Sequence, residues 1–245
     1  MTKRLLRAAS PPRRTTVKAA VPPGDELFAP DAVADLPAPA RRLLGAAVDS
    51  FAERGFHATT TRDIATRAGL SPAGLYVHYP SKSALLGHLS RVGHEAALRI
   101  VERTLALPGE SPRRLHALVA AFVAWHAEHH TVARVVQYEL RSLDPGDRAV
   151  VTALRRELEQ LVEREVRRGV AAGTLATPHP RQATRAILSL AVDVARWYDP
   201  SGAESPTRLG RIYADLALRM LGAEDAGVGD TGPDDGTGPD DEEAT

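Results

Sequence analysis

The sequence predicts an all-α fold in which a small N-terminal module of three helices precedes a larger helical module. Between residues 37 and 221, apolar residues recur at intervals of three and four, as on one face of an α-helix. No segment of this region alternates between apolar and polar residues as a half-buried strand would. Glycine, proline and serine interrupt the pattern repeatedly, which divides it into separate helices.

Composition limits the classes to which the protein can belong. Its 245 residues suffice for two modules, since domains commonly hold roughly 100 to 200 residues. Hydrophobic residues make up 43% and charged residues 25%, so a core can form. The absence of cysteine excludes disulfides and thiolate-bound metal centres. We expect a cytoplasmic protein with no membrane partner, because neither a signal peptide nor a run of about 18 apolar residues is found.

The formal net charge of zero hides two oppositely charged ends. Residues 1–36 are rich in proline and begin with a basic stretch, which predicts a disordered basic arm. Residues 222–245 hold nine acidic residues and no basic one, and they repeat Thr-Gly-Pro-Asp-Asp, which predicts a disordered acidic tail.

The first two helices are bounded by residues with clear capping roles. The first should end at Gly55, a residue suited to the left-handed conformation after a helix. Thr60 is expected to cap the second helix, with Asp63 at its third position, and Gly69 should end it. The apolar face of the first helix comprises Leu43, Leu44, Ala47, Val48 and Phe51.

The third and fourth helices follow at once. Ser71 should cap the third, with Pro72 at its first position, where a missing N–H has no cost. Pro80 ends that helix, and Ser81 should cap the fourth, which stops before Pro108. The apolar stripe of the fourth helix comprises Leu85, Leu89, Val92, Ala96 and Ile100.

Five more helices are predicted beyond residue 112, over residues 113–128, 132–141, 147–172, 181–198 and 207–221. In the helix over residues 147–172, the residues expected to face inward are Leu154, Leu158, Leu161, Val162 and Val166. The last two helices carry wide apolar faces, made of Ile187, Leu190, Ala191 and Val194 in the first and of Leu209, Ile212, Tyr213, Leu216 and Met220 in the second. Arginine and glutamate alternate at three- and four-residue spacing over residues 155–168, which predicts an exposed face laced with salt bridges.

Two short helices joined by Gly69 and Leu70 form a helix-turn-helix pattern between Thr60 and Tyr79. Many helical hairpins share this pattern, so the individual residues carry the argument. They closely resemble the signature of the tetracycline-repressor (TetR) family over residues 37–97. The matching residues are Thr59-Thr60-Thr61-Arg62-Asp63-Ile64-Ala65, Ala68-Gly69-Leu70-Ser71, Leu75-Tyr76, His78-Tyr79, Ser81-Lys82 and Leu85-Leu86.

The resemblance implies a DNA-binding domain over residues 37–97 and a ligand-binding and dimerisation domain over residues 98–221. It further implies a transcriptional regulator, most simply a homodimeric repressor that a small-molecule effector releases from a palindromic operator. A two-fold protein suits a palindrome, with half-sites roughly 34 to 36 Å apart or a multiple of that. The C-terminal part agrees with the family only in the layout and size of its helices.

The resemblance also implies which residues contact DNA. Thr61, Lys82, Tyr76 and His78 are expected to contact phosphates, and Arg62 is expected to reach a guanine edge, which discriminates by roughly 1 to 3 kcal/mol. The full set of predicted DNA-binding residues is Thr60, Thr61, Arg62, Ser71, Pro72, Ala73, Gly74, Tyr76, Val77, His78 and Lys82.

Several of these positions also have a simpler structural interpretation. Thr60 is first a helix cap, and Tyr79 is expected to pack against neighbouring helices rather than contact DNA. Residues 72–74 (Pro-Ala-Gly) offer no side-chain donors, so sequence reading would depend on Arg62, thymine methyl groups and DNA shape. The basic arm is expected to be a solvated tail, with phosphate or minor-groove contacts as the alternative.

The last two predicted helices are expected to form the dimer interface, with an ordinary intrachain core as the alternative. Helices between residues 100 and 180 would enclose the effector pocket. Its candidate lining residues are Phe122, Trp125, His126, Tyr138, Arg141 and Trp197. Within the family, residues 81–95, 195–200 and 213–217 look like those of regulators of lipid or aromatic-acid catabolism that respond to acyl-CoA thioesters.

Other classes of function are less favoured by the sequence. His126, His129 and His130 with Glu128 suggest a metal site, but a solvated helix end is the preferred interpretation, and we expect no metal or cofactor. The chain has no phosphate-binding loop, nucleophile motif or His-Glu-x-x-His segment, which argues against a small helical enzyme. A regulator that needs no ligand, or an activator, stays an alternative.

Overall fold

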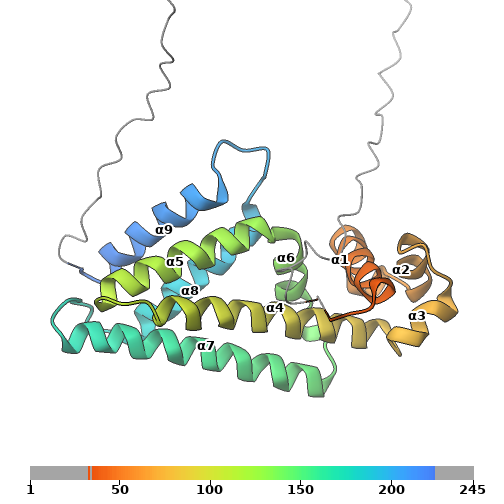
Figure 1. Ribbon diagram of the computed structural model, residues 1–245, viewed down its shortest axis with the longest axis horizontal. Helices are drawn as coiled ribbons and strands as arrows, with labels where there is room; N and C mark the ends of the chain where they lie inside the picture. Colours follow the sequence, from red (N-terminus) through yellow and green to blue (C-terminus); the bar gives the residue numbers. More distant parts are fainter. Residues whose placement is uncertain (1–32, 34, 224–245) are drawn as a thin grey trace, which may run out of the picture.

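The computed structural model describes residues 33 and 35–223 of the chain (Figure 1). Within them there are nine α-helices, one short 3-10 helix and no strand, which confirms the predicted all-α fold. The predicted basic arm and acidic tail lie outside the described residues apart from the few positions next to the helices.

The N-terminal module consists of α1 (Ala38–Ala58), α2 (Thr61–Arg67) and α3 (Pro72–His78). Gly55 interrupts α1 with φ of +76°, as expected of a residue that ends the regular helix there. The Thr60 hydroxyl accepts from the Asp63 amide, and the Asp63 carboxylate accepts from the Thr60 amide, so the predicted cap is a complete capping box. Ser71 caps α3 in turn by accepting from the amide of Gly74.

The remaining elements are α4 (Lys82–Leu105), α5 (Ser111–Glu128), α6 (His130–Tyr138), η3 (Glu139–Ser142), α7 (Pro145–Ala171), α8 (Pro180–Trp197) and α9 (Pro206–Met220). Their order is the predicted one. The single helix expected over residues 132–141 is in fact α6 followed by the 3-10 turn η3. This turn redirects the chain into α7.

Two hydrophobic cores are connected by the long helix α4, which runs from the N-terminal module along the whole larger module (Figure 1). The first core contains α1, α2, α3, the first half of α4, and α6. The second contains α5, α8, α9, the later half of α4 and much of α7. Val92 belongs to the first core and Ala97 to the second, so the predicted domain boundary after residue 97 falls inside an unbroken helix.

The predicted salt-bridged face of residues 155–168 is only partly correct. Arg167 and Glu163 do form an exposed pair, with 2.6 Å between Nη2 and Oε1. Glu165, however, is buried, and its carboxylate accepts from both Arg114 and Arg168. Arg155 is also partly buried and contacts α4 and α6. Both follow the inward stripe of α7, which decides their burial despite their charge.

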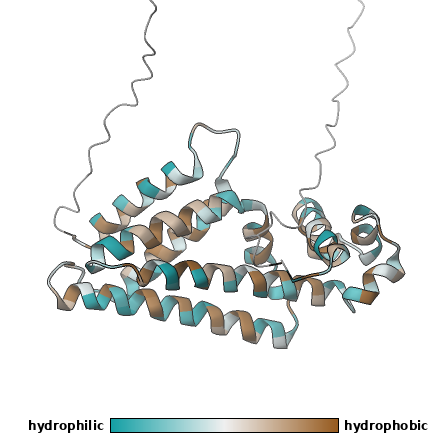
Figure 2. Cartoon of the chain, in the orientation of Figure 1, coloured by the Kyte–Doolittle hydropathy of each residue, from teal (hydrophilic) through white to brown (hydrophobic). Residues whose placement is uncertain are grey.

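The predicted wide apolar faces of α8 and α9 are buried only in part. Hydrophobic and hydrophilic residues are interspersed along the outer helices (Figure 2). Tyr213 is partly buried, but several of the large apolar residues on these faces are substantially exposed. They form, with Trp197, what we call the outer apolar face, made of Leu190, Trp197, Ile212, Leu216 and Met220. The inward face of α9 instead uses Leu209, Gly210, Ala214, Ala217 and Leu218, which pack against α5.

Candidate nucleic-acid interface and pocket

The helix-turn-helix displays most of its predicted DNA-binding residues to solvent. Within the described chain Arg62 is exposed and has no ion pair or side-chain hydrogen bond, so its guanidinium is available. On α3, Val77 is 79% exposed and Tyr76 53% exposed. The inward side of the same two helices is held by Ile64 and Leu75, both fully buried. The motif therefore has one face for packing and one free face.

Tyr76 and Tyr79 have different environments although both lie near the end of α3. The Tyr76 hydroxyl lies 3.2 Å from the Thr61 hydroxyl, which joins the start of α2 to the exposed side of α3. Tyr79 is buried, and its hydroxyl lies 3.2 Å from Nδ1 of His88 on α4. Burial raises the pKa of Tyr79 to about 12. The prediction that Tyr79 packs internally is confirmed.

Lys82 has a structural role that the sequence did not indicate. Its ammonium donates to the carbonyl oxygens of Phe56 and Thr59 at 2.7 and 2.8 Å, and to that of His57 at 3.3 Å. It also lies 4.4 Å from the centre of the Phe56 ring. These contacts fix the end of α1 to the start of α4, and they engage all three ammonium hydrogens. Its predicted phosphate contact would have to share these hydrogens.

Glu139 binds the backbone amide of Phe56, the residue whose carbonyl oxygen accepts from Lys82. Its Oε1 accepts from the Phe56 amide at 3.0 Å, and its Oε2 accepts from the Ser142 hydroxyl at 3.0 Å. Glu139 directly follows α6, whose buried residues Val132 and Val135 pack in the same core as α1. A movement of α6 is thereby connected to the base of the helix-turn-helix.

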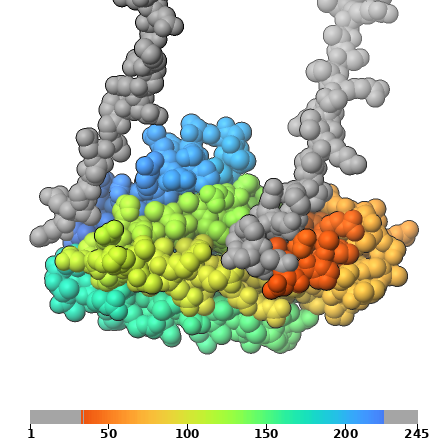
Figure 3. Space-filling view, in the orientation of Figure 1, coloured from red at the N-terminus to blue at the C-terminus, as the bar shows by residue number. Residues whose placement is uncertain are grey.

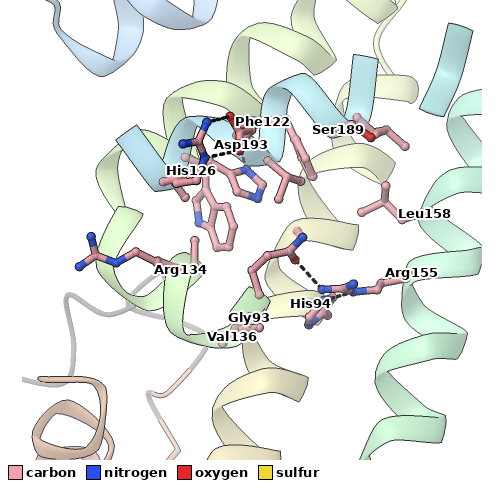
Figure 4. Close-up of a pocket in the computed structure, with 18 of the residues that line it drawn as sticks. Gly93, His94, Phe122, His126, Arg134, Val136, Arg155, Leu158, Ser189 and Asp193 are labelled. Carbon is pink, nitrogen blue, oxygen red and sulfur yellow. Dashed lines mark hydrogen bonds and ion pairs between the residues drawn. The ribbon is translucent and has the colours of Figure 1, made fainter. Parts of the chain in front are cut away.

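A pocket of about 400 Å³ opens in the larger module (Figure 4). This volume lies within the range of roughly 300 to 1,000 Å³ that is usual for small-molecule sites. The wall is built by α4, α5, α6, α7 and α8, so α8 contributes beyond the predicted limit of residue 180. Phe122, Trp125 and Leu158 supply apolar surface, and a few charged side chains supply polar surface.

Four of the six predicted lining residues do line this pocket, namely Phe122, Trp125, His126 and Tyr138. Arg141 and Trp197 do not. Arg141 is exposed on η3, beyond the end of α6. Trp197 is 46% exposed at the end of α8, and its ring centre lies 6.4 Å from that of Tyr213 on α9. Arg141 follows the end of α6, and Trp197 lies on the exposed side of α8 together with Leu190.

Two pocket residues that the sequence analysis did not single out are His94 and Arg155. The Arg155 Nε donates to Nε2 of His94 at 2.8 Å, and its Nη2 donates to Oε1 of Gln137 at 2.6 Å. Since Nε2 of His94 accepts, its proton must lie on Nδ1, which donates to the Ser90 carbonyl oxygen at 2.6 Å. Figure 4 shows this pair at one end of the pocket, with His126 and Asp193 toward the other.

Both pocket histidines are neutral at pH 7. Burial lowers the pKa of His126 to about 4, although its Nδ1 donates to the Phe122 carbonyl oxygen at 2.8 Å. Burial, with the nearby Arg155 guanidinium, also lowers the pKa of His94 to about 4. Neutral imidazoles and aromatic rings give this wall a largely uncharged surface in which Arg155 is a fixed cation.

These lowered values predict a loss of stability in mild acid. A histidine whose pKa is lower in the folded chain than in the unfolded chain binds a proton more readily in the unfolded chain. The unfolding free energy therefore falls as the pH drops from about 6.5 toward 4. Between pH 7 and pH 5 we expect on the order of 1 to 2 kcal/mol of lost unfolding free energy per histidine. Urea unfolding at both pH values measures this. His126→Gln should show a smaller drop than wild type, whereas the exposed His57→Gln should show the same drop.

The suggested histidine metal site finds no support in the geometry. His126 belongs to α5 and His130 to α6, so they do not share one helix face. The expectation that this is a solvated helix end is wrong for His126, which is buried. Among residues 33 and 35–223, no three histidine, cysteine or acidic residues are grouped closely enough to hold a metal ion. No helix in that part of the chain is long and apolar enough to cross a bilayer.

Comparison with known proteins identifies related families for both modules. Residues 43–89 match the family described as bacterial regulatory proteins, tetR family. Residues 109–221 match the family described as tetracyclin repressor-like, C-terminal domain. The two matched segments correspond to the helix-turn-helix module and to the module that holds the pocket.

Individual relatives extend over most of the chain. The HTH-type transcriptional repressor KstR2 of Rhodococcus jostii (strain RHA1) is 30% identical over 182 residues, covering 73% of this chain and 89% of the relative. The crystal structure of a tetR-family regulatory protein from Rhodococcus RHA1 is 38% identical with a TM-score of 0.71, covering 76% of this chain and 98% of that one. The ketosteroid transcriptional regulator KstR2 of Mycobacterium tuberculosis is 26% identical with a TM-score of 0.70, covering 75% and 96%.

Proposed function

The chain belongs to the TetR family of bacterial transcriptional regulators, and from this premise we propose that it represses transcription as a homodimer that a small effector releases from a palindromic operator. The observation that supports this proposal most directly is the presence of an exposed helix-turn-helix face and of a pocket in the larger module, joined by α4 and α6. We expect it to act in the cytoplasm, where the operator lies, and without catalytic chemistry of its own.

In this proposal the exposed side of α2 and α3 enters the major groove. Arg62 would read a guanine, and Tyr76 and Val77 would lie against the backbone and the thymine methyl groups. Thr61 can contact a phosphate because its hydroxyl is exposed beside that of Tyr76. The first residues of α3 bring the backbone close to DNA, because Pro72 and Ala73 are small and exposed. The residue ranges of the two domains and the DNA contact assigned to each residue are part of this proposal.

An operator shift assay across several salt concentrations tests this function. DNA from upstream of the chain's own gene should contain a palindrome that binds far more tightly than random duplex of equal length. Arg62→Ala should weaken operator binding by roughly 1 to 3 kcal/mol and relax the preference at one base pair. Arg67→Ala, whose guanidinium is already engaged by Glu53, provides a matched control that should retain base preference. Equal affinity for operator and random DNA would contradict the proposal.

Dimerisation is supported by the outer apolar face of α8 and α9. Leu190 and Trp197 are seven residues apart on α8, and Ile212, Leu216 and Met220 are four apart on α9, so each set follows one side of its helix. Trp197 and Tyr213 bring the two sets together. Large apolar side chains gathered on one surface are typical of an interface. Two copies joined there would present two helix-turn-helix units.

Release requires that a ligand in the pocket alter the helix-turn-helix, and α6 offers the route. Gln137 and Tyr138 line the pocket, and the next residue, Glu139, binds the Phe56 amide near the end of α1. A ligand that displaces α6 would pull on this bond. The differential affinity of the ligand for the two arrangements would supply the free energy.

Glu139→Ala is expected to weaken this coupling without emptying the pocket. An effector that raises the melting temperature of the wild type should still raise that of the variant. The factor by which the effector lowers operator affinity should be at least about fivefold smaller in the variant than in the wild type, since coupling energies are typically 1 to 3 kcal/mol. Glu139→Gln keeps an oxygen acceptor and should retain more of the coupling. Undiminished release in Glu139→Ala would exclude this route.

The effector is proposed to be a lipid or aromatic catabolite, with its acyl-CoA thioester as one form. The aromatic and aliphatic lining of the pocket favours such a molecule over a polar metabolite. Exposed Tyr138 and Arg196 at the rim leave an opening through which a larger headgroup could extend. A regulator that needs no ligand, or an activator, is the second candidate, and the same shift assay with and without thioesters distinguishes them.

A further inference from the structure

Two cations in the pocket wall, Arg134 and Arg155, lack a carboxylate partner among the described residues, and Arg155 is the one that neighbouring pocket side chains hold in place. Of the charged side chains lining the pocket, Glu159 is paired with Arg185, and Asp193 is paired with Arg196 through two contacts of 2.8 and 2.9 Å. The partners of Arg155, by contrast, are the neutral groups of His94 and Gln137. The pocket therefore carries a positive charge that the described residues do not balance.

The geometry of Arg155 leaves donors available. A guanidinium has five N–H groups, and only one on Nε and one on Nη2 are used. The remaining hydrogens lie on Nη1 and Nη2, along one edge of the guanidinium. From this edge the guanidinium can donate to both oxygens of one carboxylate, which is the bidentate geometry. His94, itself held by Ser90, fixes the plane of this fork. Leu158, one turn further along α7, provides apolar surface next to it (Figure 4).

The environment makes an anionic partner favourable. Burial lowers the pKa of Arg155, and the groups hydrogen-bonded to its guanidinium are neutral. A cation in such a place binds an anion more strongly than an exposed one does, because less water competes. Ala97, Phe122 and Val192 elsewhere in the lining are apolar, so the rest of a molecule that binds Arg155 through an anion should be apolar too.

From the Arg155, His94 and Gln137 cluster in the pocket wall, we infer that the effector is an apolar organic acid whose free carboxylate binds the Arg155 guanidinium. The inference rests on the proposed effector role of this pocket and narrows it. It places the charged end of the ligand inside the cavity, against α4 and α7. A thioester that lacks a free carboxylate would leave Arg155 without its partner.

Isothermal titration of the full chain tests the inference without DNA. The probes are octanoate, decanoate and phenylacetate, their methyl esters, and octanoyl-CoA. We expect at least one acid to bind at least about tenfold more tightly than its ester, since hydrogen bonds to charged groups contribute roughly 1.5 to 3 kcal/mol. Arg155→Gln should remove this preference, and Arg155→Lys should retain part of it.

Arg164→Gln is the matched control, because Arg164 is exposed on the same helix α7 but does not line the pocket. It should preserve the acid preference within about twofold. Tighter binding of esters or of octanoyl-CoA than of acids would overturn the inference, as would no binding of any acid. A lowered melting temperature of Arg155→Gln with an unchanged acid preference would show a purely structural arginine and would also overturn it. Failure of the repressor proposal would appear separately, as loss of operator specificity in the shift assay.

Discussion

Leu216→Glu is expected to convert the protein from a dimer to a monomer and to reduce operator affinity by at least about a hundredfold. Leu216 is 48% exposed in the centre of the outer apolar face, between Ile212 and Met220 on α9. A residue at the centre of a two-fold interface lies near the axis and close to the same residue of the other copy, so two carboxylates would be buried close together. A monomer contacts only one half-site, and each factor of ten in affinity corresponds to about 1.4 kcal/mol.

Light scattering after gel filtration measures the mass, and an operator shift measures the affinity. Val150→Glu is the control, because Val150 is 44% exposed but lies on α7. Figure 3 shows α7 and α9 on opposite edges of the larger module. This variant should remain dimeric and bind operator normally. If Leu216→Glu stayed dimeric with full affinity, the proposed interface would have to be abandoned.

The local features of the N-terminal module could be predicted because they depend on residues close in sequence. The Thr60 capping box, the Ser71 cap before Pro72 and the break at Gly55 each involve at most a few neighbouring positions. Such contacts are encoded by residue type and spacing alone.

The contacts that connect the modules could not be predicted, because they join distant parts of the chain. Glu139 and Phe56 are 83 positions apart, and Lys82 reaches a carbonyl 26 positions earlier. Nothing in the spacing of these residues indicates their pairing. They appear only once α1, α4 and α6 are packed together. The DNA-contacting role of Lys82 stays a prediction beside its observed structural role.

The inward position of Arg155 could have been recognised from the sequence. Val151, Arg155, Leu158 and Val162 follow one another at spacings of four, three and four, so Arg155 lies on the inward stripe of α7. A charged residue at an inward position has a different environment from one on a solvated face. Interpreting the whole run as exposed therefore missed both Arg155 and the buried Glu165, although the periodicity placed them inside.

Gly210→Val is expected to destabilise the protein by about 2 kcal/mol or more. Gly210 lies on the inner side of α9, where α9 meets α5. A Cβ atom built there would lie 2.3 Å from the carbonyl oxygen of Ala120 and 3.1 Å from its carbon. Because the obstacle is helical backbone, it cannot rotate away as a side chain could, and the two helices would have to separate. Overpacking of this kind typically costs about 1 to 3 kcal/mol, and sometimes more.

Gly146→Ala separates this steric effect from the general effect of replacing glycine in a helix. Gly146 lies in the first turn of α7, and a Cβ there would meet no atom within 4 Å. Its replacement should be neutral or stabilise by about 0.4 to 1 kcal/mol, because the unfolded chain loses conformational freedom. Thermal unfolding at one fixed protein concentration compares the variants, since dimerisation makes the melting temperature depend on concentration. Equal melting temperatures for Gly210→Val and wild type would mean that α9 can move away from α5 at little cost, and the close contact would then not hold the larger module together.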